Sequence, residues 1–400
     1  MRSEWWVSLI AVLIVVGGLA VGAYIFRQKA RDKQIQQQIA LIESLQAEKR
    51  YDQALAQIEA LAPKVRQPQT QRHLERLAVQ TLMRVNKTDE ARQRAEAFLE
   101  ANPDDPHLGT ILYCLGKIAL EQEHNRQKAA GYFEKVVRRF SSDRFYPGAL
   151  LGLANVDVQL GDLLSAKSKL DELIELPLES DLKPSVEDLL GQVNTALLFS
   201  RNQLPGDQFY EVQPGDAPIR IAQRFGIQVE LLQRCNGIKD PRALRAGRRL
   251  KIPNVDFSIV VNLSDNTLTL VNHGKFFRKY RVRTGRFNGL TPTGQFAIRT
   301  KLEDPQWEDP ATGKIYAPGH PENELATRWM GFDRAGLGIH GTIHPESIGQ
   351  YASRGCIGML TEEVEELYDL VPRGTPVTIV GERRPPDYSA AETPSETENP

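Results

Sequence analysis

The sequence has few cysteines and no excess of charge of either sign. Three cysteines in 400 residues cannot form the framework of paired disulfides that stabilises small secreted domains, and an odd number leaves at least one thiol free. The 50 basic and 51 acidic residues nearly cancel, so the chain lacks the positive field that nucleic-acid binding requires. The composition therefore indicates globular domains and no nucleic-acid partner.

Charged side chains are also absent from residues 5–26, near the N-terminus. A helix of this length can cross the ~30 Å hydrocarbon core of a bilayer. A cleaved signal peptide is the alternative, but this apolar run exceeds the usual ~7–15 residues of such peptides. We therefore expect residues 1–27 to form an uncleaved transmembrane helix, although the basic residues that follow it favour a cytoplasmic location for the rest of the chain.

From residue 34 to residue 205, apolar residues recur at three- and four-residue spacing, which predicts an all-α region. Four alanines lie about 37 residues apart, and each opens an apolar helix: Ala54, Ala91, Ala129 and Ala166. This period resembles that of tetratricopeptide (TPR) repeats; a plain helical bundle is the alternative. Because the region contains no catalytic constellation, we expect it to dock a protein partner or to act as a spacer.

Between residues 208 and 254 the pattern predicts a strand, two amphipathic helices and a closing strand, with glycines at the turns. The segments that carry this pattern are Tyr210-Glu211-Val212-Gln213-Pro214-Gly215-Asp216, Asn236-Gly237-Ile238 and Leu244-x-x-Gly247. Along nearly its whole length this stretch is similar to the LysM module, a small βααβ fold that binds the N-acetylglucosamine-containing glycan of peptidoglycan or chitin. The resemblance implies glycan contacts at Gly215, Asp216, Asn236 and Gly237; a module kept only as a spacer is the alternative.

Two glycine-flanked segments place an imidazole and a thiol near each other: Gly338-Ile339-His340-Gly341-Thr342 and Ser353-Arg354-Gly355-Cys356-Ile357-Gly358-Met359. A free cysteine supplies little thiolate at neutral pH, so a nucleophilic cysteine needs a neighbouring base. Glycines allow tight turns and close approach, so the amides of Gly355 and Cys356 can face a developing oxyanion. The pattern predicts a cysteine acyltransferase with Cys356 as nucleophile and His340 as base.

Two other interpretations use the same residues. Cys356 can be a buried structural cysteine, but it lies in a polar turn, whereas Cys114 and Cys235 lie in apolar helical patterns and are predicted core residues. His340, His344 and Cys356 can also be zinc ligands, but no second Cys/His pair accompanies them. We therefore expect no metal and no cofactor.

The His-Gly-Thr and Ser-x-Gly-Cys-Ile-x-Met segments closely resemble the signature of the L,D-transpeptidase (YkuD-type) catalytic domain, and so do Thr284-Gly285 and Thr291-Pro292-Thr293-Gly294 upstream. The resemblance implies a mainly-β domain over residues 256–381, whose helical pattern is confined to 361–370. It also implies supporting or oxyanion roles for Gly341, Thr342, Ser353, Arg354 and Gly355. One departure stands out: the family usually has Arg where this chain has Gly358, and Arg354 is the nearest replacement.

The same resemblance implies the function of a multidomain cell-wall enzyme. Cys356 would form an acyl-enzyme with the peptidoglycan stem tetrapeptide, release the terminal D-alanine and pass the acyl group to an amine. Because that substrate lies outside the cell, we expect a single-pass membrane protein of the cell envelope with its catalytic domain outside the cytoplasmic membrane. An L,D-carboxypeptidase and a non-catalytic peptidoglycan-binding scaffold are the alternatives. The tail over residues 382–400, rich in Pro, Glu, Ser and Thr, is predicted to be disordered.

Overall fold

The computed structural model describes residues 2–383, and their side chains from Ala23 onward. All but the first two residues of the predicted disordered tail lie outside this part. The chain divides into two compact units, Met1–Asp162 and Leu163–Pro400, which are described separately. This division falls inside the all-helical stretch 34–205, which we predicted as one region.

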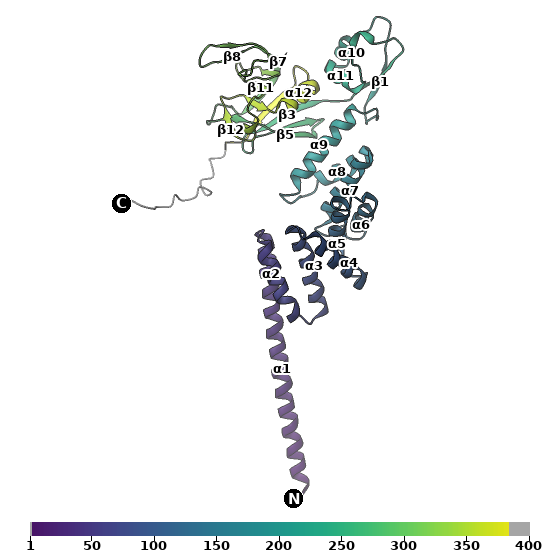
Figure 1. Ribbon diagram of the computed structural model, residues 1–400, viewed down its shortest axis with the longest axis vertical. Helices are drawn as coiled ribbons and strands as arrows, with labels where there is room; N and C mark the ends of the chain where they lie inside the picture. The colour runs from purple at the N-terminus through teal and green to yellow at the C-terminus, as the bar shows by residue number, and fades with distance from the viewer. Residues whose placement is uncertain (1, 384–400) are drawn as a thin grey trace, which may run out of the picture. The chain divides into compact units, whose positions relative to one another are not determined.

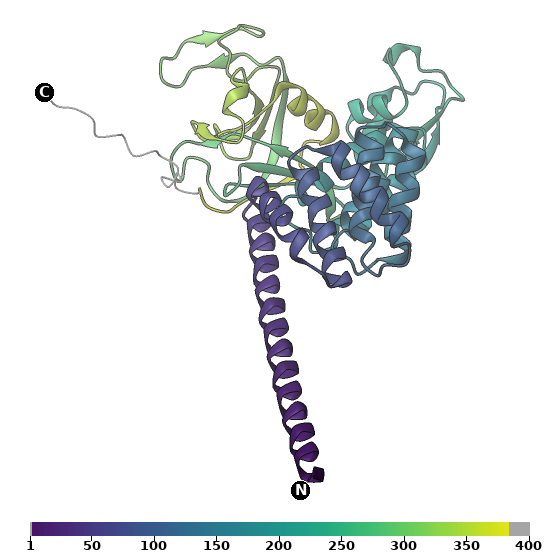
Figure 2. The same cartoon turned by 60° about the horizontal axis from the view of Figure 1, so that its bottom comes forward.

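The first unit consists of helices, and each helix packs against the one that follows it in the chain (Figure 2). Its elements are α1 (Arg2–Ala47), α2 (Tyr51–Leu61), the 3-10 helix η1 (Ala62–Lys64), α3 (Pro68–Arg84), α4 (Thr88–Ala101), α5 (Gly109–Glu121), α6 (Arg126–Arg139) and α7 (Tyr146–Leu160). The recurring alanines Ala54, Ala91 and Ala129 lie early in α2, α4 and α6 and are fully buried, because a small side chain lets neighbouring helices approach closely. The all-helical prediction is confirmed, and the TPR assignment stays a prediction.

The described side chains of α1 include many charged residues at its exposed positions. From Ala23 onward the helix carries the charged residues Arg27, Lys29, Arg31, Asp32 and Lys33, which interrupt any apolar run. Within the described residues, no helix is both long enough and apolar enough to cross a membrane. This finding contradicts the transmembrane helix predicted over residues 5–26, and with it the single-pass localisation; the side chains of residues 1–22 lie outside the description.

The second unit begins with α8 (Leu163–Ile174) and α9 (Lys183–Phe199) and continues into a small βααβ module. Ala166, the fourth recurring alanine, is fully buried in α8. The module comprises β1 (Gln208–Glu211), α10 (Pro218–Phe225), α11 (Val229–Cys235), the 3-10 helix η2 (Pro241–Ala243) and β2 (Arg249–Ile252). Its strands β1 and β2 pair antiparallel, and its predicted element order is confirmed.

The buried residue Lys251 forms hydrogen bonds that join this module to the end of α9. The Lys251 ammonium donates to the carbonyls of Ser200 at 3.2 Å and Asn202 at 2.7 Å, and it forms an ion pair with Asp207 at 3.3 Å. Carbonyls at a helix C-terminus lack partners within the helix, so a cation placed there satisfies them. The module and α9 are therefore joined by a buried polar contact as well as by the chain.

The remaining residues form the mainly-β domain. Its eight-stranded mixed sheet has the order β13-β11-β10-β7-β14-β3-β4-β5. Figure 1 labels β3, β5, β7 and β11 of this sheet. The strands are β3 (Phe257–Asn262), β4 (Thr267–Asn272), β5 (Lys275–Arg281), β7 (Gly294–Glu303), β10 (Arg328–Phe332), β11 (Gly338–Gly341), β13 (Ile357–Met359) and β14 (Pro376–Val380). Two short pairs are added, β6 (Thr284–Gly285) with β12 (Tyr351–Ser353) and β8 (Trp307–Glu308) with β9 (Ile315–Tyr316), together with the 3-10 helix η3 (Pro345–Ser347). The helix α12 (Thr361–Leu370) packs on β10 and β11, at the residues where the sequence predicts it.

Candidate active site

Two neighbouring strands hold the predicted nucleophile and base. β11 and β13 run parallel, with Ile339 opposite Ile357 and His340 opposite Gly358. Cys356 immediately precedes β13, and its Sγ lies 3.2 Å from the carbonyl oxygen of Gly336, in the segment that leads into β11. Because side chains alternate between the faces of a strand, Cys356 and His340 project from the same side of the sheet. The structure therefore brings these two residues together.

His340 is buried and held in one tautomer. Its Nδ1 lies 2.5 Å from the carbonyl oxygen of Gly341, and because a carbonyl can only accept, Nδ1 carries the proton and Nε2 keeps a lone pair. Burial lowers the pKa of His340 to about 4, helped by the nearby positive charge of Arg283 and opposed by the backbone carbonyls of Gly341 and Glu324. The imidazole is therefore neutral at pH 7, as a general base must be.

The thiol is also uncharged at rest. Burial raises the pKa of Cys356 above its ordinary value of 9.0, while the Gly338 amide and the charge of Arg283 act in the opposite direction. Thiol and imidazole are therefore both uncharged at rest, and not thiolate and imidazolium. A neutral thiol and a neutral imidazole on neighbouring strands can support general-base activation, in which the thiol proton passes to the imidazole.

The turn that presents Cys356 is held by two hydroxyl groups. Ser353 Oγ donates to the carbonyl of Cys356 at 2.6 Å and accepts from the Gly355 amide at 3.1 Å, and Thr291 Oγ1 donates to the Gly355 carbonyl at 2.7 Å. Gly355 has a φ of +136°, and a Cβ there would lie 2.7 Å from the carbonyl oxygen of Leu290. Because Ser353 already engages the Gly355 amide, the Cys356 amide remains as the other predicted oxyanion donor.

The other predicted supporting residues have partners away from the thiol. Arg354 Nη1 donates to Asp309 Oδ1 at 2.6 Å, in the loop that connects β8 and β9. Thr342 Oγ1 accepts from the amide of His344 at 3.0 Å and so shapes the turn after β11, and His344 pairs with Glu346 at 3.3 Å. Over the described residues, no group of three His, Cys, Asp or Glu side chains is arranged as metal ligands.

Arg283 is a site residue that the sequence prediction missed. Its backbone forms a two-way bridge with Gly358, its side chain is buried, and its charge acts on both Cys356 and His340. The sequence does not single it out, because Arg281 and Arg286 stand close by; its burial between Val282 and Thr284 is seen in the structure. A charge in such a stretch is seldom buried without a partner.

The predicted glycan-binding residues of the small module build its turns. Asp216 accepts hydrogen bonds from the Tyr210 hydroxyl at 2.7 Å and the Gln213 amide at 2.8 Å. The Asn236 amide group donates to the carbonyls of Leu232 at 2.9 Å and Lys251 at 2.8 Å, and its oxygen accepts from the Lys251 amide at 2.7 Å. Gly215 and Gly237 have φ values of +84° and +59°, which favour glycine.

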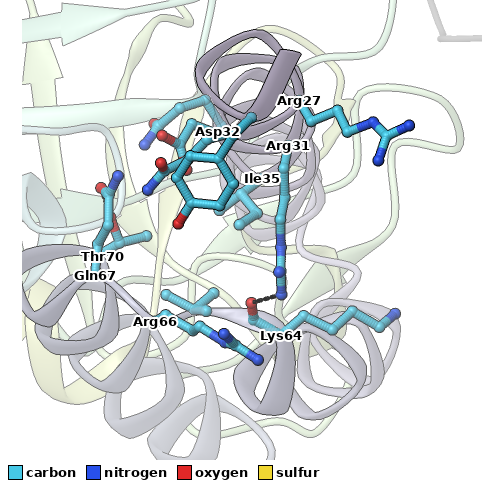
Figure 3. A pocket seen from close by; sticks show the side chains of 12 residues that line it. Arg27, Arg31, Asp32, Ile35, Lys64, Arg66, Gln67 and Thr70 are labelled. Carbon is cyan, nitrogen blue, oxygen red and sulfur yellow. Dashed lines mark hydrogen bonds between the residues drawn. The ribbon is translucent and has the colours of Figure 1, made fainter. Parts of the chain in front are cut away.

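A separate cavity of 330 Å³ lies in the helical unit, between α1 and the residues that lead into α3 (Figure 3). Arg31 donates to the carbonyl of Lys64 at 2.9 Å across it, and Arg27 and Arg66 add positive charge. Its described lining contains neither cysteine nor histidine. The candidate acyl-transfer chemistry therefore belongs to the mainly-β domain.

Fold and site together define a cysteine acyltransferase on a mixed β sheet, and comparison with known proteins names the family. The L,D-transpeptidase catalytic domain (YkuD) matches residues 256–379, and the LysM domain matches residues 210–253. The chain is 38% identical over 131 residues to YqjB of Bacillus subtilis (strain 168), which covers 32% of this chain and 72% of that protein. It is 32% identical over 176 residues to YkuD of the same organism, covering 42% of this chain and 97% of that protein. The names of both relatives assign them provisionally to the L,D-transpeptidases.

Among solved structures, the L,D-transpeptidase of Enterococcus faecium is 25% identical, with a TM-score of 0.27. The match covers 31% of this chain and half of that chain. The extent and identity of the Bacillus relatives decide the assignment: the chain belongs to the L,D-transpeptidase family. It is an enzyme of the transferase class that also carries a LysM domain.

Proposed function

We propose that this chain is a peptidoglycan L,D-transpeptidase in which Cys356 is the nucleophile and His340 the general base. The observation that carries the assignment of roles is the hydrogen bond from His340 Nδ1 to the Gly341 carbonyl, which leaves Nε2 as the proton acceptor. The parallel pairing of β11 with β13 supports it, because that register places the thiol beside the strand that carries the imidazole.

The reaction proceeds in two halves. His340 takes the thiol proton while Sγ of Cys356 attacks the carbonyl of the third stem residue, and the Cys356 amide stabilises the oxyanion. The C–N bond then breaks, His340 returns the proton to the departing D-alanine amine, and a thioester remains. In the second half an acceptor amine attacks the thioester, loses its proton to His340 and leaves with the acyl group, and the thiol is restored.

The other parts of the chain support work at the cell wall. The LysM domain binds the glycan strands and keeps the catalytic domain close to the stem peptides, which raises their effective concentration. These two domains support a location in the cell envelope. The helical unit, with its recurring buried alanines, offers TPR-like surfaces on which a partner protein docks.

The full chain incubated with a disaccharide tetrapeptide, followed by mass spectrometry, tests the proposal. We expect a joined product that needs Cys356: Cys356→Ala should lower its formation at least about 1,000-fold, because no other group replaces the nucleophile. Cys235→Ala is the matched control, since that thiol is buried against the Leu198 carbonyl at 3.2 Å and lies outside the site.

The product mass separates the alternatives. Loss of D-alanine without joining would identify an L,D-carboxypeptidase that uses the same two residues. Absence of any Cys356-dependent product would contradict catalysis and favour the scaffold.

A further inference from the structure

A row of residues crosses four strand segments at the site. Trp329 lies opposite His340 on β10 and β11, His340 lies opposite Gly358 on β11 and β13, and Gly358 pairs with Arg283 through an isolated bridge. Residues paired across strands project from the same face of a sheet. Arg283 therefore stands on the face that carries His340, and Gly358 separates them without adding a side chain.

The side chain of Arg283 fills the space over Gly358. A Cβ built on Gly358 would lie 2.6 Å from Arg283 Cγ, which is closer than real Cβ contacts. The φ of Gly358 is outside the left-handed region, so its backbone would accept any residue. Arg283 is thus what excludes a side chain at position 358, the position where the family signature has an arginine.

The guanidinium of Arg283 has a buried donor without a partner among the described residues. Its side chain is only 5% exposed, and its Nε has no hydrogen-bond partner among the described residues. Its ion pair with Glu324 spans 3.7 Å, longer than a hydrogen bond. Burying a cation with unsatisfied donors is costly, so these donors are expected to meet an anionic ligand.

Arg354, which the sequence suggests as the replacement for the family arginine at position 358, forms an ion pair with another residue. Its guanidinium bonds to Asp309 at 2.6 Å and its side chain is 44% exposed. Arg283, in contrast, is buried and acts electrostatically on both Cys356 and His340, which places its charge at the reacting groups.

We propose that the guanidinium of Arg283 binds the terminal carboxylate of the acyl-donor peptide. This inference rests on the proposed function, in which the scissile bond is the last peptide bond of the donor and the departing residue carries a free carboxylate. That carboxylate lies one residue from the carbonyl that Cys356 attacks. The planar fork of a guanidinium matches a carboxylate with two parallel hydrogen bonds, so Arg283 selects donors that end at this residue.

Two donors that differ in one group test the proposal: a stem tetrapeptide with a free C-terminal carboxylate and the same peptide as a C-terminal carboxamide. For the unaltered protein we expect kcat/KM to favour the acid roughly 30- to 100-fold, the range of a charge-assisted hydrogen-bonded pair. Arg283→Ala should bring this ratio close to one, and Arg283→Lys should retain a part of it. Arg354→Gln, which also removes a cation near the site, should leave the ratio unchanged.

A double variant distinguishes position from charge. Gly358→Arg in the Arg283→Ala background returns a guanidinium from the neighbouring strand and should restore at least fivefold preference for the acid. Gly358→Arg alone should damage the domain, because Arg283 occupies the space. Unfolding temperature and the alkylation rate of Cys356 by iodoacetamide monitor the fold and the thiol in every variant.

The possible outcomes distinguish a failure of the carboxylate site from a failure of the proposed function. A preference for the acid that stays undiminished in Arg283→Ala, or undiminished in Arg283→Lys if the alanine variant does not fold, overturns the carboxylate site. So does an altered alkylation rate with an unchanged ratio, which would assign Arg283 to thiol electrostatics alone. Absence of Cys356-dependent product from either donor with the unaltered protein would instead be the failure of the proposed function.

Discussion

The LysM domain and the cysteine turn both rely on glycine-rich turns and buried polar groups, but they use those groups differently. In the LysM domain, Asn236 makes three hydrogen bonds to backbone groups of the same domain. In the catalytic domain, Arg283 is buried with Nε unbonded and His340 keeps a lone pair at Nε2. Buried polar groups are normally satisfied, so the bonds of Asn236 fit a structural role, whereas the unpaired Nε of Arg283 fits the ligand site proposed above.

The largest difference between the two domains is expected when the pH is lowered, and it concerns His340. Burial holds the pKa of His340 at about 4 in the folded chain, against 6.5 when exposed, so the stability that neutral His340 contributes is complete above pH 6.5 and is lost as the pH falls toward 4. Between these values the free energy of unfolding should fall by roughly 3 kcal/mol more than in His340→Gln. Denaturant titrations followed by tryptophan fluorescence measure this difference. Equal losses in both proteins would contradict the buried neutral imidazole.

A smaller effect is expected from Asn236→Ala. Removing the amide leaves buried backbone groups of the LysM domain without partners, which should destabilise that domain by about 2 kcal/mol. Hydrogen exchange over residues 208–253 measures it, and transfer on a short soluble donor should be unaffected. Gln213→Ala is the control, because it removes an exposed hydrogen bond to the Glu211 carbonyl. Equal rates of hydrogen exchange in the two variants would contradict a structural role for the hydrogen bonds of Asn236.

The smallest effect is expected from Arg354→Gln. This variant removes the ion pair with Asp309, in which the arginine side chain is 44% exposed, and exposed pairs contribute little. Steady-state kinetics should show a change in kcat/KM below about fivefold. A loss of a hundredfold or more would place Arg354 among the groups that contact the substrate and would weaken the case for Arg283.

The sequence predicts those parts that depend on local pattern. The βααβ module, the helix over residues 361–370, and the nearness of His340 and Cys356 all follow from motifs short enough to be read along the chain. Arg283 could not be predicted in the same way, because its contact with Gly358 joins residues far apart in sequence through one isolated bridge. Arg354 shows the converse: it lies next to the cysteine turn in sequence, yet its side chain points to the β8–β9 loop.

The contact between Arg283 and Gly358 also limits which residues can occupy these two positions in related proteins. Because the arginine side chain and a side chain at position 358 would occupy the same volume, the two positions are not free to change independently. A relative that carries a long side chain at the position of Gly358 should have a small residue at the position of Arg283, and the reverse exchange should accompany it. The pair should therefore appear in related sequences as a linked substitution. Some members should carry the arginine on one strand, and others should carry it on the neighbouring strand.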